Sequence, residues 1–135
     1  MAYGVLVYLP ETTVTPEEQA NFESAFIIGN KLNHTYDTIS LTDDYGSFLT
    51  FYGYLPTINW PNRWDRNLLH VQGKPIPDPQ AIMDRLNPDA SYRYFVVTSF
   101  MELQLQPDLQ VYLTDHFPVL ERTDYYIIYD LQGGV

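Results

Sequence analysis

The sequence predicts an α/β domain in which helices cover a layered, mainly parallel, Rossmann-like sheet that ends in an antiparallel pair of strands. Residues 92–98 are β-branched and aromatic with almost no polar interruption, as in a strand covered on both faces. A helical pattern follows as far as His116, and two short strand-like runs, 119–120 and 126–129, come after it. This alternation of strands and helices is typical of the α/β class.

The size and charge of the chain limit the classes of protein to which it can belong. Its 135 residues fit one domain, 1–135, large enough to bury a core that needs no disulfide or structural metal. It has no cysteine, which excludes a disulfide framework and a thiolate metal site. Seven Lys and Arg against seventeen Asp and Glu give a net charge of −10, which argues against nucleic-acid binding. The acidic residues are spread along the chain, as on a solvated surface.

Aromatic residues are unusually frequent, with twelve Tyr, seven Phe and two Trp. Tyrosine serves equally in protein cores and in contacts with carbohydrates or partners, so composition alone does not choose between these roles. No run of about 18 apolar residues is present to span a bilayer. Residues 2–9 are too short for a signal peptide and lack its positive leader, so we expect a first strand or the stub of a longer protein.

The first expected helix starts with a capping box. The Thr15 side chain accepts a hydrogen bond from a first-turn amide, and the Glu18 side chain accepts one from the Thr15 amide. Pro16 suits the first helical position because the amide N–H that it lacks would have no partner there. Helical spacing places five residues on its buried face: Phe22, Ala25, Phe26, Gly29 and Leu32. The glycine in this stripe indicates close packing against the sheet.

A short strand is expected over residues 38–41, followed by an acidic turn and a second helix over residues 48–52 that must end near Gly53. Residues 56–79 contain five prolines and few periodic runs, which predicts a long functional or mobile loop. Asp78 with Pro79, and then Gln106 with Pro107, open two further helices.

Polar residues follow the two predicted parallel strands where each one ends. Ligands of open α/β sheets most often bind beyond the carboxyl ends of the strands. Here that edge carries Thr42, Asp43, Asp44, Tyr45, Thr98 and Ser99. Adjacent carboxylates at a helix start can hold a hydrated divalent cation, but capping by Asp43 or Asp44 is the favoured interpretation because Asp is among the preferred N-caps.

A second candidate site lies in the expected loop. It combines flat aromatic faces with guanidinium forks, which can stack on a sugar ring and bond its hydroxyls: Trp60, Arg63, Trp64, Asp65 and Arg66. The alternative is a structural plug, in which the two tryptophans fold the proline-rich loop onto the sheet. Exposure of the rings decides between the two interpretations.

The sequence contains no self-contained catalytic constellation. His34, His70 and His116 lie in different predicted elements without metal-ligand spacing. There is no nucleophile-elbow, Walker or dinucleotide-binding motif. We therefore expect no catalytic residue, no metal ligand and no cofactor in this chain.

Two segments, 42–53 and 94–131, resemble the soluble domain that ends many multi-spanning membrane glycosyltransferases. These enzymes are similar to protein O-mannosyltransferases and aminoarabinose transferases, and they use lipid-linked sugar donors. The shared pattern is a strand, an acidic turn, a helix that ends in an aromatic pair near glycine, and a final Tyr-x-Ile-Tyr-Asp-Leu passage at 126–131. Residues 60–64 form a longer segment than the family pattern has.

The resemblance implies an extracytoplasmic domain, periplasmic or at the cell surface, cut from a membrane protein and non-catalytic alone. Its partners would be the membrane portion of the parent and a carbohydrate or lipid-linked sugar. The family's catalytic acidic residues lie near its first membrane helices, so none is carried over to this chain. The alternative is a free-standing acidic domain that docks a basic partner. A small enzyme that uses Asp43 and Asp44 with a divalent metal ranks last.

Overall fold

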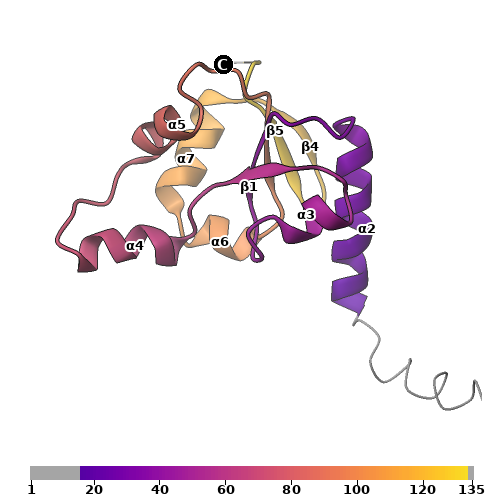
Figure 1. Cartoon of the computed structure of the whole chain (residues 1–135), viewed down its shortest axis with the longest axis horizontal. Helices are drawn as coiled ribbons and strands as arrows, with labels where there is room; N and C mark the ends of the chain where they lie inside the picture. The colour runs from indigo at the N-terminus through magenta and orange to yellow at the C-terminus, as the bar shows by residue number, and fades with distance from the viewer. Residues whose placement is uncertain (1–15, 134–135) are drawn as a thin grey trace, which may run out of the picture.

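A computed structural model describes residues 16–133 of the chain, apart from three side chains in the first helix. It is an α/β structure with an open five-stranded sheet and helices packed around it (Figure 1), as predicted. In chain order the elements are α2 (Pro16–Lys31), β1 (Thr38–Leu41), α3 (Ser47–Phe51), β2 (Thr57–Asn59), α4 (Arg63–Val71), α5 (Pro79–Leu86), β3 (Tyr94–Val97), α6 (Phe100–Gln104), α7 (Pro107–His116), β4 (Val119–Arg122) and β5 (Ile127–Asp130).

The strand order in the sheet is β2-β1-β3-β5-β4. β1 pairs in parallel with β2 and β3, whereas β5 pairs antiparallel with β3 and with β4. The predicted antiparallel pair at the C-terminus is confirmed. β3 is the middle strand, with Phe95, Val96 and Val97 fully buried, so the expectation for residues 92–98 is also confirmed.

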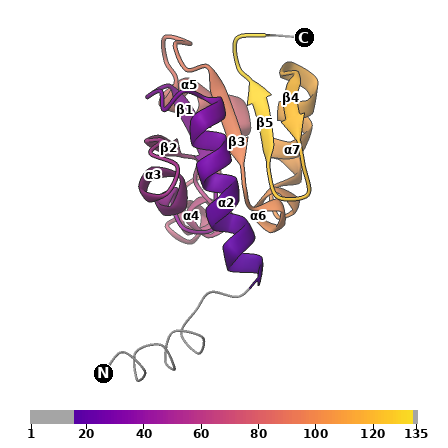
Figure 2. The same ribbon diagram turned by 90° about the vertical axis from the view of Figure 1, so that its right-hand side faces the viewer.

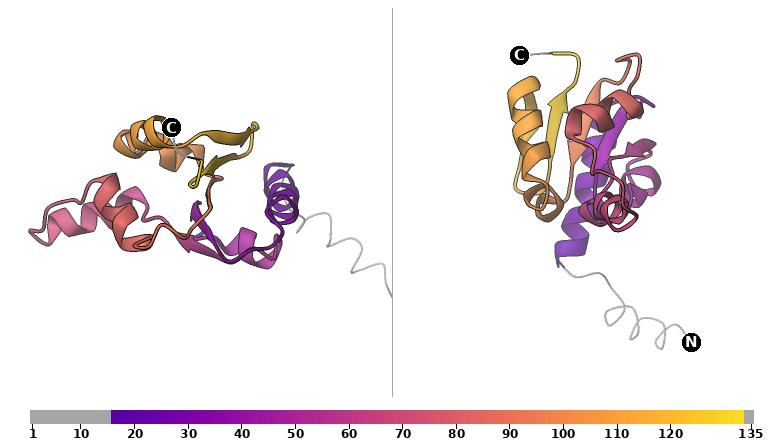
Figure 3. Two further views of the ribbon diagram at one scale, coloured as in Figure 1. Left: turned by 90° about the horizontal axis from the view of Figure 1, so that it is seen from above. Right: turned by 90° about the vertical axis from the view of Figure 1, so that its left-hand side faces the viewer.

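Each face of the sheet is covered by a different set of helices, because successive strand residues point to opposite faces. Phe95 and Val97 point into the core shared with α5, α6 and α7. Val96 points into the core shared with α2 and α3. Figure 2 shows α2 in front of the sheet, and the view from above in Figure 3 places α2 and α5 on opposite sides of it.

Helix α2 packs through Ala25 and Ile28, and Leu32 directly after its end packs with them; all three are nearly or fully buried. The expectation that Phe26 lies on this buried face is wrong, since its side chain is 55% exposed and Ile28 faces the core instead. Gly29 contacts the turn after α3 rather than the sheet: a Cβ there would overlap the backbone carbonyl of Gly53. The expected capping box and residues 2–9 lie outside the described residues.

The expectation of a long loop over residues 56–79 is wrong, because β2 and α4 lie within this range. Asn62 starts α4, and its side chain accepts a hydrogen bond from the Asp65 amide at 2.8 Å. Only residues 72–78 join α4 to α5 without regular structure. Prolines in this stretch therefore mark the ends of short elements rather than an irregular chain.

The helix starts predicted from proline are confirmed. The Asp78 carboxylate caps α5 by accepting from the Ala81 amide at 2.8 Å, with Pro79 at the first helical position. Pro107 begins α7 in the same way, although the Gln106 side chain forms no capping bond. No helix within residues 16–133 has both the length and the apolar character needed to cross a bilayer.

The outermost strand, β4, is irregular and charged. Its pairing with β5 shifts register between Val119 and Glu121. Lys31 at the end of α2 forms a 2.6 Å ion pair with Glu121, and this hydrogen bond lowers the pKa of the Glu121 carboxyl. Glu121 also accepts from the Tyr126 hydroxyl, and burial together with this bond raises the pKa of Tyr126 to about 12.

Candidate functional site

Two neighbouring parallel strands send the chain to opposite faces of the sheet. From β1 the chain continues to α3, whose Leu49 belongs to the core under α2. From β3 it continues to α6, whose Leu103 belongs to the core on the other face. The carboxyl ends of β1 and β3 are therefore a topological switch point, the place where open α/β sheets most often have a ligand crevice.

A cavity of about 270 Å³ lies at this switch point. Its walls come from α2, the turn after β1, α3, the residue that follows β3, and the hairpin between β4 and β5. The lining residues are Ser24, Ala25, Thr42, Asp43, Asp44, Phe48, Leu49, Thr98 and Tyr125. The sheet-edge residues Thr42, Asp43, Asp44 and Thr98 are thus brought together in one pocket.

The turn after β1 is held by its own polar side chains. The Gly46 amide donates to the Thr42 hydroxyl at 2.7 Å and to one carboxylate oxygen of Asp44 at 3.1 Å. The other Asp44 oxygen accepts from the Phe48 amide at 3.0 Å. Gly46 stands at the helix N-cap with φ of 81°, where its lack of a Cβ is required. Of the two aspartates considered, Asp44 is the one that accepts hydrogen bonds from backbone amides at the start of α3.

Asp43 instead connects the two strand exits. Its carboxylate accepts a 2.5 Å hydrogen bond from the hydroxyl of Ser99, which follows β3. The same hydroxyl accepts from the Glu102 amide at 3.1 Å and so caps α6. Ser99 is almost fully buried, whereas Asp43 is exposed. One oxygen of Asp43 is engaged, and the second has no hydrogen-bond donor among the described residues.

The polar groups of the pocket are hydrogen-bond acceptors or hydroxyls. Ser24, Thr42, Thr98 and Tyr125 contribute hydroxyls, Asp43 and Asp44 contribute carboxylates, and no Lys, Arg or His within the described part of the chain lines the cavity. The remaining lining is apolar or aromatic. Such a pocket suits a ligand that donates hydrogen bonds, and it disfavours a phosphate or carboxylate ligand.

The residues that the structure describes contain no group of three or more His, Asp or Glu side chains arranged to hold a metal ion. Among the described residues, Asp43 and Asp44 are the only acidic side chains that line the cavity, and one is engaged by Ser99 and the other by two backbone amides. Capping of α3 therefore accounts for Asp44, and the bond from Ser99 accounts for one oxygen of Asp43, without a cation.

Tyr45 stands beside the pocket rather than in it. Its ring is 57% exposed, and its hydroxyl accepts from the side-chain amide of Asn62 at 3.1 Å. This bond joins the turn after β1 to the start of α4.

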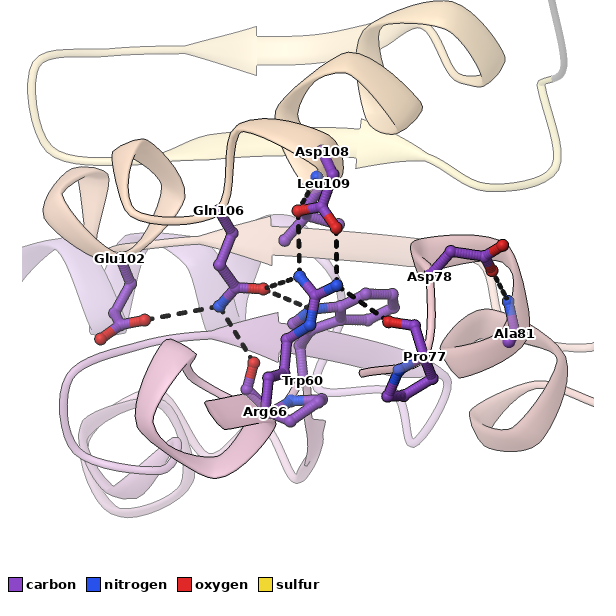
Figure 4. Close-up of polar contacts among 10 residues, drawn as sticks. Trp60, Arg66, Pro77, Asp78, Ala81, Glu102, Gln106, Asp108 and Leu109 are labelled. Atoms are coloured by element: carbon purple, nitrogen blue, oxygen red, sulfur yellow. Dashed lines mark hydrogen bonds and ion pairs between the residues drawn. The ribbon is translucent and has the colours of Figure 1, made fainter. Parts of the chain in front are cut away.

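The structure divides the five candidates of the second site. Trp60 is 2% exposed, and its indole N–H donates to Gln106 at 3.1 Å while its ring meets Phe95 edge to face. Arg66 is also buried and donates to both carboxylate oxygens of Asp108, at 3.0 and 2.6 Å (Figure 4). These two residues fasten the segment to the body of the molecule, as expected for a structural plug.

The Arg66 guanidinium makes two further bonds, to the Gln106 side chain at 3.0 Å and to the carbonyl of Pro77 at 2.9 Å. Hydrogen bonding from Arg66 holds the pKa of the Asp108 carboxyl below its usual range. In contrast, Trp64 is 72% exposed and Arg63 is exposed. Asp65 is half-buried, with its amide bonded to Asn62. The five residues do not share one surface.

Sequence reasoning missed half of the pocket wall: Ser24, Ala25, Phe48, Leu49 and Tyr125. Phe48 and Leu49 could have been found, because they follow the acidic turn on a predicted helix. Ser24 and Tyr125 carry no such signal, since their place depends on how α2 and the last hairpin pack against the sheet.

A scan of protein-family models, a search of curated proteins and a search of solved structures each found no match.

Proposed function

We propose that this chain is a non-catalytic domain that binds a hydroxyl-bearing ligand, a carbohydrate, in the pocket at the β1 and β3 carboxyl ends. The observation that carries the proposal is the coincidence of a cavity with the topological switch point, lined by acceptors and an aromatic ring. The parallel strands β2, β1 and β3 and this crevice also support a Rossmann-like arrangement for that half of the sheet.

The chemistry of the pocket supports a neutral polyol. Sugar hydroxyls donate to carboxylate oxygens, and Asp43 keeps one oxygen without a donor among the described residues. Phe48 and the half-exposed ring of Tyr125 offer flat faces to sugar C–H groups. The volume of about 270 Å³ is just under the usual range of about 300–1,000 Å³ for small-molecule sites, which suits one small ring.

The larger context is part of the same proposal. The resemblance of residues 42–53 and 94–131 supports a soluble extracytoplasmic domain of a membrane glycosyltransferase that uses a lipid-linked sugar. In that setting the domain would help to orient sugar or acceptor, and the catalytic groups would belong to the membrane portion. An upstream reading frame without membrane helices would refute this part and leave the pocket untouched.

The charge distribution does not favour the alternative of an acidic docking face. Asp43 follows β1 at the carboxyl edge of the sheet, whereas Asp89 precedes β3 at the opposite edge, and both side chains are exposed. A basic partner that binds by charge needs its carboxylates on one face.

Titration of the isotopically labelled chain with neutral monosaccharides tests the pocket. Binding is expected to shift the amide resonances of Phe48 and Thr98, which line the cavity, and of Gly46, whose amide bonds to the lining residues Thr42 and Asp44. Asp43→Asn should weaken the shifts, while the matched variant Asp115→Asn, an exposed carboxylate on α7, should leave them unchanged. No shift with any neutral sugar at millimolar concentration would refute carbohydrate binding.

A further inference from the structure

Ser24 is a buried polar residue within α2 for which the fold itself shows no use. Its side chain is 7% exposed, and the residues that share the buried face, Ala25 and Ile28, are apolar. A serine inside a helix usually bonds a carbonyl of the preceding turn or points to solvent. The Ser24 hydroxyl does neither, since it is buried and has no hydrogen-bond partner among the described residues. Buried polar groups are normally bonded, so this exception calls for a reason.

The cavity at the carboxyl ends of β1 and β3 supplies that reason, because Ser24 lines it. Thr42, which is 9% exposed, lines the same cavity. The Thr42 hydroxyl accepts a hydrogen bond from the Gly46 amide at 2.7 Å, and its own proton has no acceptor in the described part of the chain. The cavity therefore has two buried hydroxyl groups that can still bond a ligand.

Backbone contacts next to Ser24 fix its position. A Cβ on Gly53 would lie 2.4 Å from the carbonyl oxygen of Ala25, and a Cβ on Gly29 would lie 1.8 Å from the carbonyl oxygen of Gly53. Helix α2 thus touches the turn after α3 through backbone atoms on the residue that directly follows Ser24. The hydroxyl is held in place before a ligand arrives, which avoids the cost of ordering it on binding.

The buried and exposed polar groups of the cavity have different bonding abilities. Ser24 and Thr42 are buried and can donate through their hydroxyl protons, whereas Asp43 is exposed and, when ionised, can only accept. A ligand that bonds all three residues must present an acceptor oxygen to the two hydroxyls and an O–H donor to the carboxylate. The hydroxyl groups of a sugar ring meet both requirements.

We propose that Ser24 is the specificity-determining residue of this pocket, and that it binds, together with Thr42, one hydroxyl group of a single sugar ring. The inference rests on the proposed carbohydrate binding and narrows the class of ligand. The ligand is a neutral monosaccharide unit in which this one hydroxyl is neither missing nor substituted. The cavity of about 270 Å³ leaves no room for a second ring, so a glycosidic bond at this oxygen would collide with α2.

Loss of this one hydroxyl should weaken binding more than loss of any other. An analogue without it would place a C–H group against the buried hydroxyls of Ser24 and Thr42 and leave them without a partner. Sites that bond a hydroxyl of their ligand discriminate strongly against analogues that lack it, for this reason. A sugar hydroxyl near the exposed Asp43 can instead be replaced by water at little cost.

The test begins with glucose, galactose and mannose and continues with the monodeoxy analogues of the sugar that binds most tightly. Dissociation constants come from the amide shifts of Phe48 and Thr98, which line the cavity. One analogue is expected to bind the unmodified chain roughly tenfold more weakly than its parent, and the others less than about threefold more weakly. Ser24→Ala should bind the parent roughly tenfold more weakly and should no longer distinguish it from that analogue.

Two controls accompany this cycle. Ser91→Ala removes an exposed hydroxyl that precedes β3, at the opposite edge of the sheet, and should leave every sugar affinity unchanged. Ser24→Ala should not lower the thermal midpoint, because alanine favours a helix and no hydrogen bond within the described residues is lost. A lowered midpoint would assign the hydroxyl to structure and overturn the inference.

The sugar data separate the inference from the function on which it rests. A Ser24→Ala chain that weakens the parent and all its analogues by the same factor would refute the role of Ser24 and leave carbohydrate binding intact. Failure of every neutral sugar to bind the unmodified chain would refute carbohydrate binding, and the inference with it.

Discussion

Helices α2 and α4 are attached to the same sheet by opposite physical means. α2 buries apolar side chains and meets the turn after α3 backbone to backbone, at Gly29 and Gly53. α4 buries an arginine and turns Trp64, Leu68 and Val71 to solvent. The hydrophobic pattern of a helix therefore shows which side is apolar, but only the contacts show whether that side faces the core.

The two attachments should respond differently to perturbation. Apolar burial is non-directional and nearly independent of pH. An arginine with five hydrogen-bond donors demands partners in fixed positions, and one of those partners is a titratable carboxyl group. Four predictions use this difference, in order of decreasing expected effect.

Gly29→Ala is expected to be the most damaging, because the added Cβ would overlap the carbonyl oxygen of Gly53. Overpacking against backbone should lower the free energy of unfolding by about 3 kcal/mol, measured by urea denaturation. The matched control is Gly73→Ala, where the Cβ meets open space and only the positive φ costs about 1 kcal/mol. Equal effects of the two changes would show that α2 and α3 are not closely packed.

Arg66→Met should cost about 2 kcal/mol, because the carbonyl of Pro77 and the Asp108 carboxylate lose their donor. The thermal midpoint and the emission of Trp60, whose indole shares the Gln106 oxygen with Arg66, report the loss. Arg63→Met removes an exposed arginine of the same helix and should change stability by less than about 0.5 kcal/mol. A neutral Arg66→Met would mean that the helix is held by other contacts.

Acidification should loosen the attachment of α4 through Asp108. The pKa of Asp108 is lowered in the folded chain from an ordinary 3.8, so its stabilising contribution is present above that value and is lost as pH falls through the lower folded pKa. Since the side chain is 48% exposed, the effect should stay below about 1 kcal/mol. The stability difference between the wild type and Asp108→Asn should shrink below pH 4. A difference that is constant with pH would contradict this.

The smallest effect is expected on the outer side of α4. Trp64→Ser should change the free energy of unfolding by less than about 0.5 kcal/mol, because the ring is mostly in solvent. Trp60→Phe leaves the Gln106 oxygen without its indole donor and leaves a gap next to Phe95, so it should cost more than that. Differential scanning calorimetry of both variants would measure the contrast, and a reversed order would contradict the burial of the two rings.

What the sequence predicts well is local. Residues 92–98 indicate a doubly covered strand because nearly every side chain is apolar or aromatic, and β3 is the middle strand. Asp78 with Pro79 marks a helix start through bonds made within three residues. Asp43 and Ser99 are fifty-six positions apart, yet each directly follows one of two neighbouring parallel strands. The sequence therefore places both residues at the carboxyl edge of the sheet, where they meet.

What it misses depends on distant partners. Nothing near Arg66 shows that Gln106 and Asp108, about forty residues later, fasten it, so α4 was expected to be part of a loop. Phe26 follows the helical spacing of the predicted buried face of α2, yet Ile28 faces the core instead. The close approach of Gly29 to Gly53 sets the rotation of the helix about its axis. Tyr125 reaches the pocket only through the turn of the last hairpin.

The bulged edge strand β4 also limits growth of the sheet. A strand from another molecule would have to follow the register shift between Val119 and Glu121. It would also remove water from Arg122 and from the Lys31–Glu121 pair. Such kinks and charges are how natural sheets discourage edge-to-edge polymerisation. Straightening this strand and neutralising it would therefore open a route to fibrous aggregation that the native chain keeps closed.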